Sequence, residues 1–161
     1  MRIFRVLRAA YAHAAFDGEG GYRYGGRWSS PGTRLAYASE HQSLAMLEYF
    51  VHLDPEDPPD DLVLATAEVP ESLPRERAEA RALRADWRDV PAPRELAQIG
   101  DEFAKKAQNC LLFVPSALAV NENNVLINPE HPEFRKIAVN KAEPLQYDPR
   151  MFRKTGRRRK H

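Results

Sequence analysis

Proline residues divide this chain into short segments, and this feature limits the fold more than any other. Thirteen of the 161 residues are proline, and most lie in connecting stretches such as 54–59 and 91–93. Proline has no backbone N–H and a fixed φ, so it interrupts helices and central strands alike. The elements between the prolines must therefore be short, although the chain is long enough for one ordinary domain with its own core.

The hydrophobic pattern between these interruptions predicts a mixture of strands and helices. Apolar alternation or short apolar runs favour strands at 2–7, 34–38, 62–69, 111–114, 125–127, 135–139 and 144–147. Helices are expected in three places: after a capping box formed by Ser39 and Gln42, over the charged segment 75–83, and over the amphipathic segment 94–108. Residues 16–30 hold five of the eight glycines and predict a shaped loop. This order indicates an α+β domain.

Composition and charge exclude several classes of protein. Hydrophobic residues make up 43% and charged residues 29% of the chain, which is typical of a globular protein. The single cysteine, Cys110, is expected to be a buried apolar residue in a reducing compartment. No apolar run approaches the ~20 residues that span a bilayer, and the first fifteen residues lack the pattern of a signal peptide. We therefore expect a cytoplasmic protein with no membrane association.

The charge is unevenly distributed along the chain. The net charge is +1, but six basic residues lie between positions 153 and 160, so the rest carries +1 − 6 = −5. An acidic body argues against direct nucleic-acid binding by the domain itself. We expect one folded domain over residues 1–150, followed by a basic, disordered tail over residues 151–161.

Common catalytic and cofactor motifs are absent from the sequence. It has no phosphate-binding P-loop, no Gly-x-Gly-x-x-Gly fingerprint and no Gly-x-Ser-x-Gly elbow. The five histidines show no spacing typical of a metal site, so we expect neither a metal nor a bound cofactor.

Four scattered residues remain as candidates for chemistry. Arg27 follows two glycines, which suits a guanidinium aimed at a phosphate, although loop arginines are more often solvated. Glu48 lies at the margin of an apolar helix face, facing either a cleft or a nearby basic partner. Tyr37 stands between two alanines and suits either a core position or a flat heterocycle. Ser116 follows a strand and has the ordinary role of a turn or a cap.

These residues and their neighbours resemble one known family of bacterial toxins, the RES domain, named for an Arg, a Glu and a Ser. The resemblance runs from about Ile3 to Tyr147 and is carried in chain order by Gly25-Gly26-Arg27-Trp28-Ser29, Leu35-Ala36-Tyr37-Ala38-Ser39, Leu47-Glu48, Ile99-Gly100-Asp101, Val114-Pro115-Ser116 and Leu126-Ile127-Asn128-Pro129. Ser29 departs from the pattern, since the family more often has Asn after the Trp, and we expect this difference to matter little.

The resemblance implies a fold, an activity and a partner. The fold would be similar to that of ADP-ribosyltransferase toxins, with a split β-core around an NAD-binding cleft. The protein would deplete NAD, its substrate, by cleaving the nicotinamide–ribose bond as a glycohydrolase or phosphorylase, and an Xre-type helix-turn-helix antitoxin would block the cleft. By position, the resemblance assigns catalysis to Arg27, Tyr37 and Glu48, and NAD binding to Arg5, Arg27, Tyr37, Ser116 and Asn128.

Three other functions are compatible with the same residues. The first is transfer of ADP-ribose to a protein, which uses the same cleft with another acceptor. The second is an RNA-targeting toxin that uses the basic tail, which the acidic body disfavours. The third is a non-catalytic module in which Arg27 and Glu48 are structural. The sequence leaves the acceptor open between water, phosphate and protein.

Overall fold

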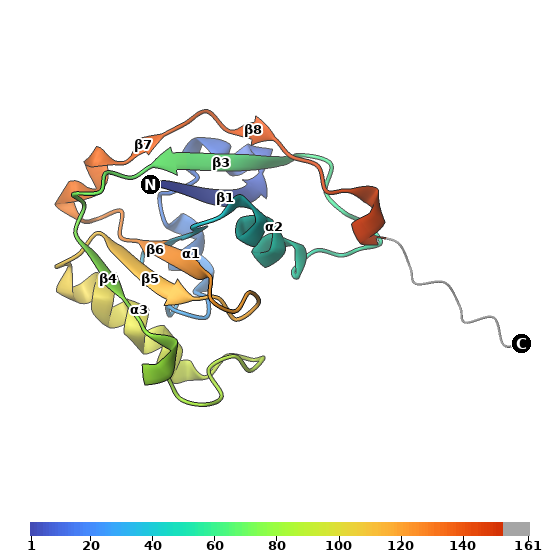
Figure 1. The fold of residues 1–161 in the computed structure, drawn as a ribbon. Helices are drawn as coiled ribbons and strands as arrows, with labels where there is room; N and C mark the ends of the chain where they lie inside the picture. Colours follow the sequence, from blue (N-terminus) through green and yellow to red (C-terminus); the bar gives the residue numbers. More distant parts are fainter. Residues whose placement is uncertain (153–161) are drawn as a thin grey trace, which may run out of the picture.

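A computed structural model describes residues 1–152 and shows a mixed sheet with helices packed around it (Figure 1). The order along the sheet is β4-β5-β6-β2-β1-β3-β7, and β8 pairs with β3. The strands are β1 (Arg2–Arg8), β2 (Ala36–Ser39), β3 (Leu62–Glu68), β4 (Arg75–Arg77), β5 (Leu111–Pro115), β6 (Asn123–Ile127), β7 (Ala138–Val139) and β8 (Glu143–Pro144). All pairings are antiparallel except that of β4 with β5.

The sheet is nearly divided between β1 and β2. Only Phe4 and Ser39 pair across this seam, whereas β1 and β3 pair along seven residues and β2 and β6 along four. One half therefore contains β1, β3, β7 and β8, and the other contains β2, β4, β5 and β6, as the upper and lower groups of strands in Figure 1 show. The expected α+β class with a split β-core is confirmed.

Within residues 1–152, three α-helices surround the sheet: α1 (Glu19–Tyr24), α2 (Gln42–Phe50) and α3 (Arg94–Lys106). Helix α2 packs against β1 and β2, and thus lies beside the seam. Helix α3 lies along β4 and β5 in Figure 1 and buries Leu96 and Phe103 in a cluster with Trp28 and Leu35. Its apolar residues recur at helical spacing, which explains why the predicted helix over 94–108 is confirmed. The 3₁₀ helices are Ala9–Ala14, Ala80–Ala82, Pro132–Lys136 and Pro149–Phe152.

The core is continuous through the central strands. In β5 the four residues from Leu111 to Val114 are all buried, since the sheet is covered on both faces at this point. Burying one such side chain contributes about 2 kcal/mol to folding, so the strands beside the cleft are firmly anchored. Cys110 is buried at the start of β5, as expected, and burial raises the pKa of its thiol to about 11.

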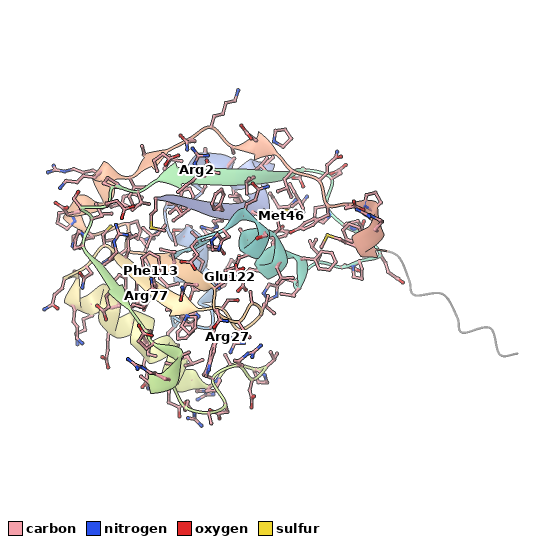
Figure 2. All side chains as sticks on the ribbon, viewed as in Figure 1. Arg2, Arg27, Met46, Arg77, Phe113 and Glu122 are labelled. Carbon is pink, nitrogen blue, oxygen red and sulfur yellow. The ribbon has the colours of Figure 1, made fainter. Side chains whose placement is uncertain are left out.

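The charged segment 75–83 is not a helix, which corrects the sequence-based expectation. Residues 75–77 form β4 and pair in parallel with β5, and only Ala80–Ala82 form a 3₁₀ turn. The guanidinium of Arg77 lies 4.9 Å from the centre of the Phe113 ring, and Figure 2 shows the two side by side. The composition of this segment favours a helix, but pairing with β5, more than thirty residues later in the chain, stabilises a strand instead.

The expected capping box is also wrong. Ser39 ends β2, and α2 begins at Gln42 with His41 as its N-cap residue and without a side-chain capping bond. The Ser39 hydroxyl donates instead to Asn124 Oδ1 at 2.7 Å. Two smaller differences concern other predicted elements. The glycine-rich loop contains α1, and the strand predicted over 135–139 is shorter, because residues 135 and 136 end a 3₁₀ helix and only Ala138–Val139 form β7.

Two further expectations concern membrane association and the basic C-terminal tail. Within residues 1–152, no helix has both the length and the apolar character needed to cross a membrane. The basic positions from 153 to 160, which carry the expected tail, lie outside the described residues.

Candidate active site

Two hollows meet beside the seam and form one cleft. The first, of about 470 Å³, lies between β1, β2 and α2. The second, of about 810 Å³, lies between α2, the glycine-rich turn at 25–28 and the loops near residues 90 and 117. Both are lined by Tyr37, Glu48, His52 and Asn124, so these four residues mark the junction.

Glu48 is held at the junction by one of its two oxygens. Its Oε1 accepts hydrogen bonds from Ser116 Oγ at 2.8 Å and from Asn124 Nδ2 at 2.6 Å. Oε2 accepts none from any side chain or backbone group within residues 1–152. The carboxylate is half-buried, as its place at the margin of the helix face predicts. It is therefore fixed in orientation and keeps one free oxygen.

Ser116 acts on the cleft through Glu48. It is buried and does not line either hollow, and its Oγ accepts the backbone N–H groups of Leu118 and Ala119, each at 3.0 Å. With both acceptor positions in use, its hydroxyl hydrogen points to Glu48. The Ser116 hydroxyl thus stabilises the turn that follows β5 and also donates a hydrogen bond to Glu48.

Tyr37 lies in β2 and contacts the glycine-rich turn. Its hydroxyl shares a hydrogen bond with Ser29 Oγ at 2.7 Å, and a Cβ on Gly26 would lie 2.7 Å from the same oxygen. Burial raises the pKa of Tyr37, although the bond to Ser29 acts in the opposite direction, so the phenol stays protonated at neutral pH. Ser29, the departure from the family pattern, is therefore in direct contact with a site residue.

Arg27 forms the opposite wall. Its Nη1 donates to the carbonyl oxygens of Trp87 at 2.7 Å and Asp89 at 3.1 Å. Within the described part of the chain, its Nε and Nη2 donate to no protein group. In Figure 2, Arg27 lies below Glu122, while Met46 marks α2 above them. The arginine thus faces the second hollow from a loop rather than from a strand or helix.

Helix α3 supports the turn that carries Arg27. A Cβ on Gly100 would lie 1.9 Å from the carbonyl oxygen of Trp28, so only glycine permits this approach. Asp101 Oδ1 accepts from the backbone N–H of Ser30 at 2.9 Å and from Thr33 Oγ1 at 2.7 Å. Burial acts to raise the pKa of Asp101, but these hydrogen bonds outweigh it and lower the pKa.

The two additional NAD-binding candidates differ in position. Arg5 lines the first hollow, and its Nη1 donates to the carbonyl oxygen of Ala15. Burial lowers the pKa of Arg5 from its usual high value. Asn128 lies beyond the other end of β6, where it is buried beside Cys110 and its Oδ1 accepts the backbone N–H of Glu130. The structure therefore brings Arg5, Arg27, Tyr37 and Glu48 to one cleft and leaves Asn128 outside it.

Several residues of the cleft, Asn124, His52 and Ser39 among them, were not assigned to it from the sequence. Asn124 and His52 line both hollows, and Ser39 lines the first. His52 lies in the turn that follows α2, four residues after Glu48, so the helical spacing of the two residues is only an approximate signal. Asn124 belongs to a polar run whose orientation depends on how β6 pairs with β2, which local sequence does not reveal.

Known proteins and one family model match this chain over nearly its whole length. A family model described as the RES domain matches residues 2–148. A protein of Sphingobium sp. (strain YBL2) described as a Prs ADP-ribosylating toxin is 36% identical over 156 residues, covering 94% of this chain and 97% of that protein. A protein of Pseudomonas putida described as Toxin Res is 36% identical over 150 residues, covering 91% and 99%.

A solved structure matches the fold. A chain in the crystal structure of the M. tuberculosis MbcT-MbcA toxin-antitoxin complex superposes with a TM-score of 0.73, covering 94% of this chain and 86% of that one. Its sequence identity of 16% supports a common fold and nothing finer.

Proposed function

The chain belongs to the RES domain family, and from this premise we propose that it is the toxin of a toxin–antitoxin pair and cleaves the nicotinamide–ribose bond of NAD. Full-length relatives that are described as toxins support the first part. The geometry of the cleft supports the second.

One observation carries the chemical proposal: Glu48 presents a single free oxygen at the junction of two hollows. When the bond between ribose C1′ and the nicotinamide nitrogen breaks, its electron pair stays on the nitrogen and neutral nicotinamide leaves. The ribose then carries a positive charge, which a fixed carboxylate stabilises. An acceptor oxygen bonds to C1′ and gives up its proton, which completes the reaction.

The remaining cleft residues suit the other parts of NAD. The Nε and Nη2 groups of Arg27 are available to donate to two oxygens of one phosphate group. A guanidinium binds two such oxygens through parallel hydrogen bonds. Arg5 supplies further positive charge in the first hollow. The Tyr37 ring lies between the hollows and offers an aromatic face to the flat, cationic nicotinamide. NAD is the substrate in this scheme, and the chemistry requires neither a metal nor a resident cofactor.

A second candidate is transfer of ADP-ribose to a protein. The 36% identical relative described as an ADP-ribosylating toxin favours it. Bond cleavage is the same in both cases, and only the acceptor differs between water, phosphate and a protein side chain.

The proposed partner is an antitoxin of the Xre type that covers the cleft. The structural match to a chain of a toxin–antitoxin complex supports such a partner. Exposed apolar side chains at the mouth of the second hollow suit a protein contact, with Val51 49%, Val90 88% and Leu118 38% exposed.

The proposal is tested with NAD labelled separately in nicotinamide and in adenine. Purified protein is expected to release labelled nicotinamide with and without phosphate, and the adenine label distinguishes ADP-ribose, its 1-phosphate and labelled protein. The Glu48→Gln variant is the control and is expected to release none. Growth arrest with unchanged cellular NAD would contradict the proposal and favour the RNA-targeting alternative, which also predicts that deleting residues 153–161 abolishes activity.

A further inference from the structure

We propose that Asn124, held in place by Ser39, is a positioning residue that presents one oxygen of Glu48 to the substrate. The reaction that this serves rests on the proposed function, but the contacts do not depend on which substrate is bound. Neither residue is part of the Arg, Glu and Ser pattern after which the family is named.

The orientation of the Asn124 amide is determined by two contacts of opposite kind. Its Oδ1 accepts from the Ser39 hydroxyl at 2.7 Å, and its Nδ2 donates to Glu48 Oε1 at 2.6 Å. A carboxylate only accepts hydrogen bonds, so a flipped amide would place two acceptors against each other. Ser39 is 3% exposed, which shields its hydroxyl from competing water. Glu48 therefore requires the amide nitrogen of Asn124, and Ser39 completes the arrangement by donating to the amide oxygen.

The consequence for Glu48 is a difference between its two oxygens. Asn124 and Ser116 both donate to Oε1, which prevents rotation of the carboxylate about its terminal bond. Hydrogen bonds to an ionised acceptor are strong, so Oε1 stays with the protein and Oε2 faces the cleft. Without Asn124, the carboxylate would rotate about its single remaining contact.

The sheet itself maintains this arrangement. Ser39 and Asn124 are direct partners in the pairing of β2 with β6, and α2 begins only three residues after Ser39. The position of Asn124 relative to Glu48 is thus set by a strand pair and by the helix that follows it, rather than by a loop. This is the rigid support that a group opposite a developing charge requires.

A neighbouring pair of residues provides a matched control. Asn123 Nδ2 donates to Glu40 Oε1 at 3.1 Å, so an amide–carboxylate pair stands one position earlier on the same strand. Neither Asn123 nor Glu40 lines either hollow. An Asn123→Asp substitution therefore places two carboxyl groups side by side on the same strand, as Asn124→Asp does, but outside the cleft.

The decisive variant is Asn124→Asp, which keeps the shape and places a second carboxyl group against Glu48. The other ionisable side chains lining the two hollows in the described structure are Arg5, Arg8, Arg27, Tyr11, Tyr37, Tyr49 and His52, so none is a carboxylate. Two adjacent carboxyl groups share one proton at moderate acidity and repel each other when both are ionised. The shared proton restores both the hydrogen bond and the single negative charge of the wild type.

The variant is therefore expected to lose activity as the pH rises. At about pH 8 we expect kcat for NAD cleavage to fall about 100-fold, with KM changed less than about threefold, because substrate binding is not the affected step. At about pH 5.5 we expect the ratio of variant to wild type to recover at least about tenfold. Asn123→Asp is expected to keep wild-type activity at every pH.

Ser39→Ala gives a second measurement that does not add charge. It removes one of the two contacts that hold the Asn124 amide, and we expect kcat to fall about tenfold at all pH values while KM and Tm stay close to wild type. This variant also keeps the test decisive if Asn124→Asp does not fold. Full activity in Ser39→Ala, an equal loss in Asn123→Asp, or a loss in Asn124→Asp that is the same at every pH would each overturn the inference.

Growth arrest after expression provides a readout that does not assume NAD as the substrate. At matched protein levels, Asn124→Asp is expected to be harmless and Asn123→Asp toxic. A wild-type protein that arrests growth without releasing nicotinamide would refute the proposed function, and the comparison of these two variants would still decide the role of Asn124.

Discussion

The two walls of the cleft are built in different ways. Glu48 stands on α2 against β2 and β6 and is held by side-chain donors from Ser116 and Asn124. Arg27 stands on a glycine-rich turn and is held by carbonyl oxygens of the loop that contains Trp87 and Asp89. One wall consists of regular elements that share the core, and the other consists of turns.

The difference corresponds to the task of each group. A carboxylate that stabilises a developing charge is effective only at a fixed position. An arginine that binds a diphosphate works by contact with a flexible ligand and tolerates movement of its loop. Substitutions in the Glu48 wall should therefore affect the rate of the chemical step, and those in the Arg27 wall should affect substrate binding and stability.

Glu48→Gln is expected to have the largest effect. The amide oxygen still accepts from Ser116 and Asn124, so the fold is kept while the negative charge is lost. Loss of one electrostatic contribution costs about 3 to 4 kcal/mol, so kcat should fall about 100- to 1,000-fold with little change in Tm. Nicotinamide release measures the rate. Glu40→Gln is the control, and an active Glu48→Gln protein would remove Glu48 from the chemistry.

Gly100→Ala tests the support of the opposite wall. The added Cβ would lie 1.9 Å from the Trp28 carbonyl oxygen, so α3 and the turn must separate. We expect the free energy of unfolding to fall by about 3 kcal/mol, as in severe overpacking. Thermal and urea unfolding measure this, with the exposed Glu102→Ala on the same helix as the control. Unchanged stability would mean that the turn is not fastened to α3.

Arg27→Ala separates binding from chemistry. A charge-assisted contact to phosphate contributes about 2 kcal/mol, so KM for NAD should rise about 30-fold, with a smaller change in kcat. Arg23→Ala removes an exposed arginine four residues earlier and should change neither value. If Arg27→Ala lowers kcat as strongly as Glu48→Gln does, the two walls are not distinct in function.

Asp101→Asn is expected to have the smallest effect, and this effect depends on pH. The pKa of Asp101 is lowered in the folded protein, so its contribution to stability is present above the unfolded value of about 3.9. It is lost as the pH falls through the lower, folded value. The variant should be less stable than wild type by about 1 kcal/mol near neutral pH, and the difference should vanish in acid. A difference in Tm that does not shrink as the solution is made more acidic would contradict this account.

Much of the Glu48 wall was predictable from local sequence. The β2 strand, the position of Glu48 at the margin of its helix, the buried Cys110 and the resemblance to the RES domain were all read from short segments and are confirmed. These features depend on alternation, helical spacing and motifs, which are properties of neighbouring residues.

The features that were wrong or missed depend on distant pairing. Ser39 reads locally as a helix cap, but β6 provides it with a partner 85 positions away. The helix predicted over 75–83 gives way to a strand because β5 is available for parallel pairing. Local patterns do not reveal which strands become neighbours.

The pairing of β2 with β6 also determines when the proposed site is completed during synthesis of the chain. A growing chain that has reached residue 100 already contains Arg27, Tyr37 and Glu48, but not Ser116 or Asn124. A slip of one residue between β2 and β6 would turn Asn124 to the opposite face of the sheet. Both donors reach the Glu48 carboxylate only after β6 has emerged from the ribosome and paired in the correct register. The proposed function therefore predicts that unfinished or mispaired chains are inactive.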